Sequence, residues 1–405
     1  DTGLKFVNND ACYPSILVAG QMIHALESGK YDLNKTALLI TQTGGGCRAT
    51  NYIGFIRRAL NDAGWGHIPV ISLNALGMEK NPGFVLTPTL VHRGLMSVFI
   101  GDLLMRVLYR TRPYEKVPGS ANKLFEKWNA QAIEMLQSSS IHKYRKLVRG
   151  IIRDFDALPL LPIKKPRVGV VGEILVKFHP TANNDLVNVI EREGAECVMP
   201  DLMDFMFYTM SDGVFRYKEL AFPKSEERNS KIIVWALQLY RNYTEKKLRK
   251  SRRFDAPSSI WKMMESVDGI IQTGNISGEG WFLTAEMVEL IHTGVPSIAC
   301  VQPFACLPNH VTGKGMIKEL RRRYPGTNIS AIDYDPGSSE VNQLNRLKLL
   351  LSNAPAGKHP DETPRGKIWT PTGEVEPQVH LAEGAVFVDP EPVAASDIPP
   401  VLDAS

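Results

Sequence analysis

The sequence predicts an α/β protein with two doubly wound lobes of the Rossmann or flavodoxin-like type, an inserted helical segment and a disordered C-terminal tail. Short apolar runs alternate with helix-patterned segments, glycines follow several of those segments, and 405 residues are too many for one ordinary core. The expected parts are lobe 1 (1–84), the helical segment (85–157), lobe 2 (158–352) and a proline-rich acidic tail (353–405).

Lobe 1 is predicted to alternate strands and helices. Its strands are short apolar runs bounded by turn residues, at 4–7, 37–41 and 68–73. Its helices carry apolar residues at helical spacing and are followed by glycine, at 11–28 and 51–63. Such alternation with short turns favours a parallel sheet. From residue 87 to 155 the pattern is helical throughout, which predicts a cap or a connecting bundle.

Lobe 2 follows a proline-marked linker at 158–165. Its predicted strands are residues 167–171, 174–178, 196–199, 268–272, 296–301 and 328–332. Its predicted helices are residues 184–193, 231–248, 258–266, 282–292, 316–323 and 340–352. The remaining residues, from 353 on, hold nine prolines and little periodic pattern, which is typical of a disordered segment.

Composition narrows the class of protein. Nine acidic and three basic residues after residue 352 give that segment a charge of −6, so the rest of the chain carries +10. That charge suits either an anionic ligand or a solvated basic surface. The basic run 246–253 lacks interleaved aromatic residues, so we expect no nucleic-acid partner. No apolar run is long enough for a bilayer, and no signal peptide is recognisable, so we expect no membrane contact and a cytoplasmic location.

Five cysteines, an odd and sparse set, indicate a reducing compartment rather than a disulfide scaffold. Cys47 follows three glycines and opens a predicted helix, where backbone N–H groups and the helix dipole stabilise a thiolate. Gly44, Gly45 and Gly46 leave those N–H groups accessible to an anion. The turn lacks a Walker sequence, but a relaxed dinucleotide-binding loop stays open as an alternative.

Cys12 and Cys306 repeat this arrangement, because each lies just past a predicted strand. Cys12 opens the helix predicted at 11–28, for which Asp10 is the candidate N-cap, and Cys306 precedes the segment 307–310. Ligands bind at that edge of open α/β sheets, so three converging thiolates could hold three irons of a [4Fe–4S] cluster. The alternative is that these cysteines are small buried hydrophobic residues. Cys197 is expected in the core, and Cys300 is either a core residue or a fourth ligand.

Six segments resemble one family. They are FVNNDACYPSILVAGQ, TQTGGGCRATNYIGFIRRAL, VGVVGEILVKFHPTANN, GEGW, QPFACLPNHVTGKG and IDYDPGSSEVNQLNR. They are similar to the C-terminal region of large, fused acyl-CoA dehydratase activase-type proteins. That region is related to the iron–sulfur subunits of 2-hydroxyacyl-CoA dehydratases, to benzoyl-CoA reductase and to double-cubane cluster proteins. The resemblance extends from residue 1 to about 352.

The resemblance implies that Cys12, Cys47 and Cys306 bind a cluster in the cleft between two lobes. It also implies low-potential electrons from an ATP-hydrolysing activator, which is a separate partner or lies upstream in a longer chain, so that ATP binds there. A substrate would be an acyl-CoA thioester or a small molecule, and a homodimer is a plausible assembly. Five cysteines are too few for a double-cubane cluster within one chain, so a single cube is expected unless two chains share a larger cluster.

Five polar residues fall on loops or strand ends near the presumed cleft and are candidates for moving protons or orienting a ligand: Glu173, Lys177, His179, Glu279 and His310. Lys177 and His179 alternate along a predicted strand and could instead be solvated, and Glu279 could cap a helix. Two other functions stay open, a non-redox module that binds a nucleotide or CoA-like anion and an idle scaffold in a larger activase.

Overall fold

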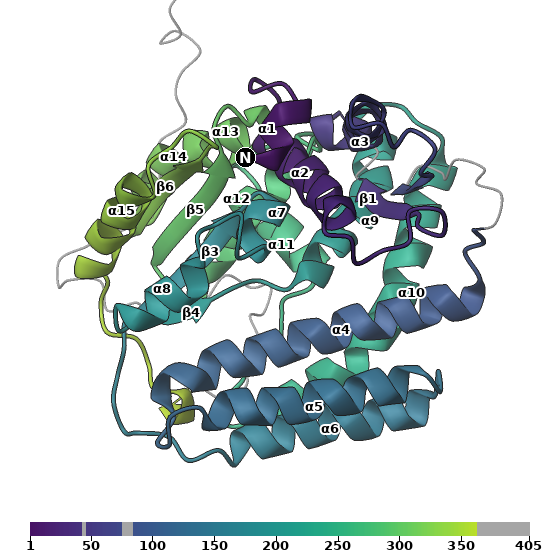
Figure 1. Ribbon diagram of the computed structural model, residues 1–405. Coiled ribbons are helices and arrows are strands. Elements are labelled where there is room, and N and C mark those ends of the chain that lie inside the picture. Colours follow the sequence, from purple (N-terminus) through teal and green to yellow (C-terminus); the bar gives the residue numbers. More distant parts are fainter. Residues whose placement is uncertain (43–45, 75–83, 363–405) are drawn as a thin grey trace, which may run out of the picture.

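The computed structural model describes residues 1–42, 46–74 and 84–362 (Figure 1). It combines many helices with two parallel sheets, which confirms the α/β class. A two-stranded sheet pairs β1 (Leu38–Gln42) with β2 (Val70–Asn74). A four-stranded sheet has the order β4-β3-β5-β6, formed by Glu196–Val198, Arg167–Gly172, Ser297–Pro303 and Asn328–Tyr334.

The N-terminal part has a hydrophobic core of its own. Helices α1 (Thr2–Phe6), α2 (Tyr13–Glu27) and α3 (Tyr52–Asp62) pack with the two-stranded sheet, and a 3₁₀ turn, η1 (Arg48–Asn51), precedes α3. The strand predicted at 4–7 is wrong, because residues 4–6 lie in α1 and Val7 is the C-cap of that helix. A methyl group on Gly3 would lie 2.0 Å from the carbonyl oxygen of Ile16, so a glycine lets α1 pack directly on α2.

The predicted helical segment is confirmed as α4 (Pro88–Thr111), α5 (Ser120–Leu136) and α6 (Ile141–Asp156). Thr87 caps α4 by accepting a hydrogen bond from the N–H of Leu90, and Pro88 occupies the first turn. These helices share one hydrophobic core with α9 (Leu202–Glu219), α10 (Lys224–Leu248) and α12 (Gly280–His292). The inserted helices therefore pack onto the C-terminal part of the chain.

Helices cover both faces of the four-stranded sheet. On one face, α12 packs against buried residues of β3, β5 and β6. On the other, α8 (Leu186–Arg192) and α15 (Glu340–Ser352) contribute to a separate cluster. Every residue of β5 is buried, as expected for a central strand of a parallel sheet. Three short helices complete this part, α11 (Ile260–Ser266), α13 (Leu307–Thr312) and α14 (Ile317–Arg323).

Two predicted strands of this part are wrong. Residues 174–178 form a short helix, α7 (Ile174–Phe178), and residues 268–272 form a turn. Gly172 ends β3 with φ +142°, and a methyl group there would lie 1.7 Å from the carbonyl oxygen of Val301. The next residue, Glu173, accepts a hydrogen bond from the N–H of Val176 at 2.8 Å and so caps α7. The chain therefore leaves the sheet at Gly172.

The boundary predicted for the C-terminal tail is also too early. Ala356 pairs with Pro166 in an isolated bridge, and Gly357 donates a hydrogen bond to Lys165. Asp361 pairs with Arg253 at 2.7 Å. Residues 353–362 thus pack on the rest of the protein, whereas the part of the tail prediction covering 363–405 lies outside the described residues.

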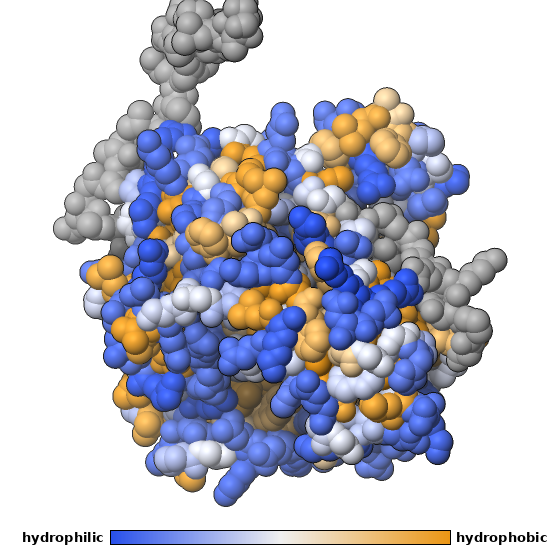
Figure 2. All heavy atoms as spheres, turned by 45° about the horizontal axis from the view of Figure 1, so that its top comes forward, coloured by the Kyte–Doolittle hydropathy of each residue, from blue (hydrophilic) through white to orange (hydrophobic). Residues whose placement is uncertain are grey.

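The face that Figure 2 presents, with the top of Figure 1 turned forward, is mostly hydrophilic, with hydrophobic residues scattered in small groups. Within the described ranges, none of the helices combines the length and apolar character that crossing a bilayer would need.

Candidate thiol and carboxylate site

Three cysteines occupy equivalent positions, each one residue before a helix. Cys12 is the N-cap of α2, Cys47 that of η1 and Cys306 that of α13. Proline follows in the first turn of α2 and of α13, where its missing N–H costs no intrahelical hydrogen bond. The prediction that these cysteines open helices is confirmed. Only Cys47 and Cys306 follow strands, β1 and β5, whereas α1 precedes Cys12, and Cys12 rather than Asp10 is the N-cap of α2.

Contacts between the N-terminal part and the C-terminal part bring the three thiols into one region. The Sγ of Cys12 lies 3.6 Å from the hydroxyl oxygen of Tyr52, which follows η1 directly. A methyl group on Gly278 would lie 4.0 Å from the Sγ of Cys47 and 3.0 Å from the Cβ of Pro308. Pro308 is two residues from Cys306, so Cys47 lies beside the loop that contacts α13.

Of the three glycines before Cys47, only Gly46 is described. A methyl group on Gly46 would lie 2.9 Å from the hydroxyl oxygen of Ser277, so this glycine permits close approach of η1 to the loop before α12. Gly44 and Gly45 lie outside the described residues, and their predicted role in binding an anion stays a prediction.

Two buried glutamates lie beside the thiols. Glu173 caps α7, and Glu279 precedes α12 and accepts a hydrogen bond from the N–H of Ile174 at 3.0 Å. Asn309 links them: with its amide oriented to satisfy both neighbours, it donates to Glu279 at 2.6 Å and accepts from the N–H of Glu173 at 2.9 Å. Asn309 is fully buried in α13, three residues after Cys306. These contacts join the starts of α7, α12 and α13.

The thiols are protonated in this environment. Burial raises the pKa of Cys12 to about 12, and the charges of Glu173 and Cys47 add to that rise. Burial likewise raises the pKa of Cys47 and of Cys306, and Glu279 and Glu173 raise both further. Hydrogen bonds from the N–H groups of Ala49 and Arg48 oppose the rise at Cys47. The expectation that helix N-termini alone would favour thiolates here is wrong, because burial and neighbouring carboxylates outweigh them.

The carboxylates hold protons as well. Burial, followed by repulsion from Glu279, raises the pKa of Glu173 to about 8. Burial also raises the pKa of Glu279. Because two adjacent buried carboxyl groups rarely ionise together, the pair retains a proton at neutral pH. At neutral pH the three thiols and the carboxyl pair therefore carry at most one negative charge between them.

The other three predicted polar residues have different roles. Lys177 is buried, not solvated, and its Nζ lies 2.7 Å from the Oε1 of Glu286. The Nε2 of His179 lies 3.0 Å from the Nε2 of Gln21. His179 therefore contacts α2, although the two residues are 158 positions apart in the sequence. The Nδ1 of His310 lies 2.9 Å from the carbonyl oxygen of Cys306, in the first turn of α13.

The remaining two cysteines lie in hydrophobic cores. Cys197 is buried on β4, as expected. Cys300 is fully buried on β5, and a methyl group on Gly313 would lie 3.1 Å from its Sγ. Burial raises the pKa of Cys300 to about 12, and Glu286 contributes to that rise. Cys300 packs with the helices of the large core, which favours its structural role over that of a fourth ligand.

The sequence reasoning did not single out the residues that support the site. Tyr52 contacts Cys12, Asn309 joins the two glutamates, and the hydroxyl of Tyr208 donates to the carbonyl oxygen of Gly278 at 3.2 Å. Tyr52 and Asn309 follow Cys47 and Cys306 by five and three residues, which is a signal that could have identified them. Tyr208 lies far away in the sequence, in a helix without any motif.

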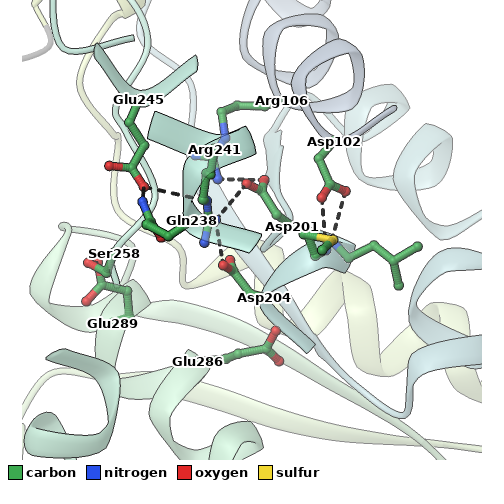
Figure 3. Close-up of polar contacts among 12 residues, drawn as sticks. Asp102, Arg106, Asp201, Asp204, Gln238, Arg241, Glu245, Ser258, Glu286 and Glu289 are labelled. Atoms are coloured by element: carbon green, nitrogen blue, oxygen red, sulfur yellow. Dashed lines mark hydrogen bonds and ion pairs between the residues drawn. The ribbon is translucent and has the colours of Figure 1, made fainter. Parts of the chain in front are cut away.

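A network of buried ion pairs lies next to Glu286 (Figure 3). Arg241 pairs with Asp204 at 2.5 Å and with Asp201 at 3.2 Å, and Arg106 pairs with Asp201 at 2.6 Å. Asp102 accepts hydrogen bonds from two N–H groups at the start of α9, each at 2.9 Å. The network ties α4, α9 and α10 together behind the site.

In the part of the chain that the structure describes, no three His, Cys, Asp or Glu side chains form a group that could hold a metal ion. A four-iron cluster has different requirements, because each thiolate binds a separate corner of the cube. The donor types fit such a cluster, and the mutual effects on pKa place Cys12 within electrostatic range of both Cys47 and Cys306. Comparisons with protein-family models, curated proteins and solved structures gave no significant match to this chain.

Proposed function

We propose that this chain is a [4Fe–4S] protein of the 2-hydroxyacyl-CoA dehydratase and activase type, built as two Rossmann-like lobes with the cluster between them. The observation that carries the proposal is the gathering of Cys12 and Cys47 from one lobe and Cys306 from the other around Glu173 and Glu279. At each of these three helix starts the backbone N–H groups of the first turn lie near the cysteine, an arrangement that suits a negatively charged cluster.

Cys12, Cys47 and Cys306 would hold the cluster through three of its irons. When bound, the cluster supplies one-electron transfer at low potential. The backbone N–H groups of Arg48 and Ala49 lower the pKa of Cys47 and would stabilise its bound thiolate. Because a metal-bound thiol is deprotonated, cluster binding would release the protons that the raised pKa values of Cys12 and Cys306 keep on these sulfurs.

The carboxyl pair would serve proton transfer. Glu173 retains its proton near neutral pH because burial raises its pKa to about 8, and Asn309 fixes both carboxyl groups relative to Cys306. A general acid is most effective when its pKa lies near the working pH. The pair therefore suits protonation of an acyl-CoA or small substrate that is reduced or dehydrated next to it.

Electrons would come from an ATP-hydrolysing activator, in trans or upstream in a fused chain, with ATP bound there. A cytoplasmic location and a homodimer belong to the same proposal. It rests on the residues of the site and on the motifs that contain them.

Electron paramagnetic resonance of anaerobically prepared protein tests the proposal. The protein is reconstituted with iron and sulfide and reduced with a low-potential donor. We expect the signal of a reduced [4Fe–4S] cluster, lost in Cys47→Ala and retained in Cys197→Ala, which removes a core thiol instead. A reconstituted protein without a cluster signal would overturn the proposal.

A non-redox module for a nucleotide or CoA-like anion is the second candidate. It is favoured by the net charge of +10 on residues 1–352, which suits an anionic ligand. Titration calorimetry of metal-free protein with coenzyme A tests it, and tight binding without a cluster would favour this function over the first.

A further inference from the structure

A basic groove of about 490 Å³ lies between the C-terminal ends of α6 and α10. Its charged lining residues are Arg149, Arg153, Asp156, Lys247, Lys250 and Arg252. The groove therefore has five cationic side chains and one carboxylate, and Asp156 is already engaged by the hydroxyl of Ser251 at 2.7 Å. Its charge is far from balanced.

Neighbouring carboxylates neutralise part of this charge. Arg153 pairs with Asp154 at 2.7 Å, and Arg252 pairs with Asp361 at 3.5 Å. For Arg149, Lys247 and Lys250, no carboxylate within the described ranges lies at ion-pair distance. Cations at a helix C-terminus complement its dipole, but two helix ends amount to about one negative charge, less than these three side chains carry.

The acidic end of the described chain already contacts the edge of the groove. Asp361 pairs with Arg253 at 2.7 Å in addition to Arg252, and Glu362 pairs with Lys164 at 3.0 Å. Two consecutive carboxylates at the end of the described chain, those of Asp361 and Glu362, thus pair with basic side chains at this edge. The occupant that fits is a polypeptide with closely spaced acidic residues.

The sequence after Glu362 has this character. Residues 363–405 contain seven acidic and two basic residues, a net charge of −5. The stretch 370–392 contains five acidic residues and neither Lys nor Arg. Glu374 is twelve residues beyond Glu362, and an extended chain spans about 3.3–3.6 Å per residue, so these carboxylates can reach a groove that begins at Arg252.

We propose that the basic groove binds an acidic polypeptide segment and that residues 370–392 of the same chain supply it. Long-range attraction between opposite charges makes this contact sensitive to salt. The inference does not depend on the thiol site, because the groove lies on α6 and α10 and shares no residue with that site.

Zero-length carbodiimide cross-linking of the full chain, read by mass spectrometry, tests the proposal. The reagent joins a lysine amine to a carboxylate only where the two are in contact. We expect links from Lys247 and Lys250 to acidic residues of 370–392, at least about fivefold above links from the exposed Lys35, and a loss of these links in high salt. Equal yields at Lys35 would overturn the proposal.

A second experiment keeps the reactive Lys247 and Lys250 and removes the positive charge of two neighbouring arginines. Arg149→Gln with Arg153→Gln should lower the yield of these links at least about threefold, whereas Arg58→Gln, on the surface of α3, should leave it unchanged. Mixed isotope-labelled and unlabelled protein distinguishes links within one chain from links between two copies. Links found only between copies would overturn the assignment to the same chain.

Discussion

The Nζ of Lys177 lies 2.7 Å from the Oε1 of Glu286, and both side chains are buried between α7 and α12. Removing one partner of a buried ion pair leaves the other charge without compensation. The pair therefore anchors α7, which begins at the site carboxylate Glu173, to the helix that follows Glu279.

Lys177→Met should lower the free energy of unfolding by about 3–5 kcal/mol, because Glu286 loses its buried partner. The double variant with Glu286→Leu should recover a large part of that loss. Denaturant unfolding measures both. Lys231→Met, which removes an exposed pair with Glu227, is the control and should cost less than about 1 kcal/mol. Equal losses at the two lysines would contradict a buried charge pair.

The stability of the metal-free protein should fall as pH rises from about 4.5 to about 8, the ordinary and the folded pKa of Glu173. The folded state binds more protons than the unfolded state in this range, so raising the pH favours unfolding. The loss should be on the order of a few kcal/mol. Urea unfolding at pH 5, 6.5 and 8 measures it.

Glu173→Gln removes one of the titrating groups and should make this dependence on pH less steep, while Asp102, Asp212 and Glu286, whose pKa burial also raises, maintain the remainder. Glu340→Gln, at the exposed start of α15, serves as the matched control and should leave the slope as it is in the unmodified protein. An unchanged slope in Glu173→Gln would show that other groups cause the dependence.

Gly172→Ala should prevent folding or reduce thermal stability severely. Its added methyl group would lie 1.7 Å from the carbonyl oxygen of Val301, at a φ of +142° that side chains rarely adopt. Gly101→Ala is the contrast, because Gly101 lies on the exposed side of α4 with open space around it. That substitution should stabilise the protein by about 0.5–1 kcal/mol. Melting curves followed by circular dichroism separate the two outcomes.

Helices and strands could be predicted from the sequence where they are long enough to show a clear hydrophobic pattern. They could not be predicted where contacts with distant residues determine the secondary structure. The long helices α4, α6 and α10 and the buried strand β5 follow from periodicity and from a continuous apolar run. Residues 174–178 are too few for periodicity to separate helix from strand. The deciding features there are the contact of Gly172 with β5 and the cap by Glu173.

The candidate site was predictable in its residue types and less so in its chemistry. The placement of Cys12, Cys47 and Cys306 at helix starts follows from local sequence, although the N-cap of α2 is Cys12 and not Asp10. Their protonation does not, because it depends on burial and on Glu173 and Glu279, which tertiary packing brings near. The partner of Lys177 is 109 residues away in the sequence, so no local pattern points to it.

Iron and sulfide analysis of a series of cysteine variants, reconstituted anaerobically, tests the central claim most directly. The claim is that three distant thiols hold one inorganic centre. We predict about four irons per chain in the unmodified protein and in Cys197→Ala. Replacing Cys12, Cys47 or Cys306 singly should lower the iron content and the sulfide content in parallel, because each substitution removes a ligand of the same cluster. Iron that is absent from the unmodified protein, or unchanged in all three variants, would contradict the account.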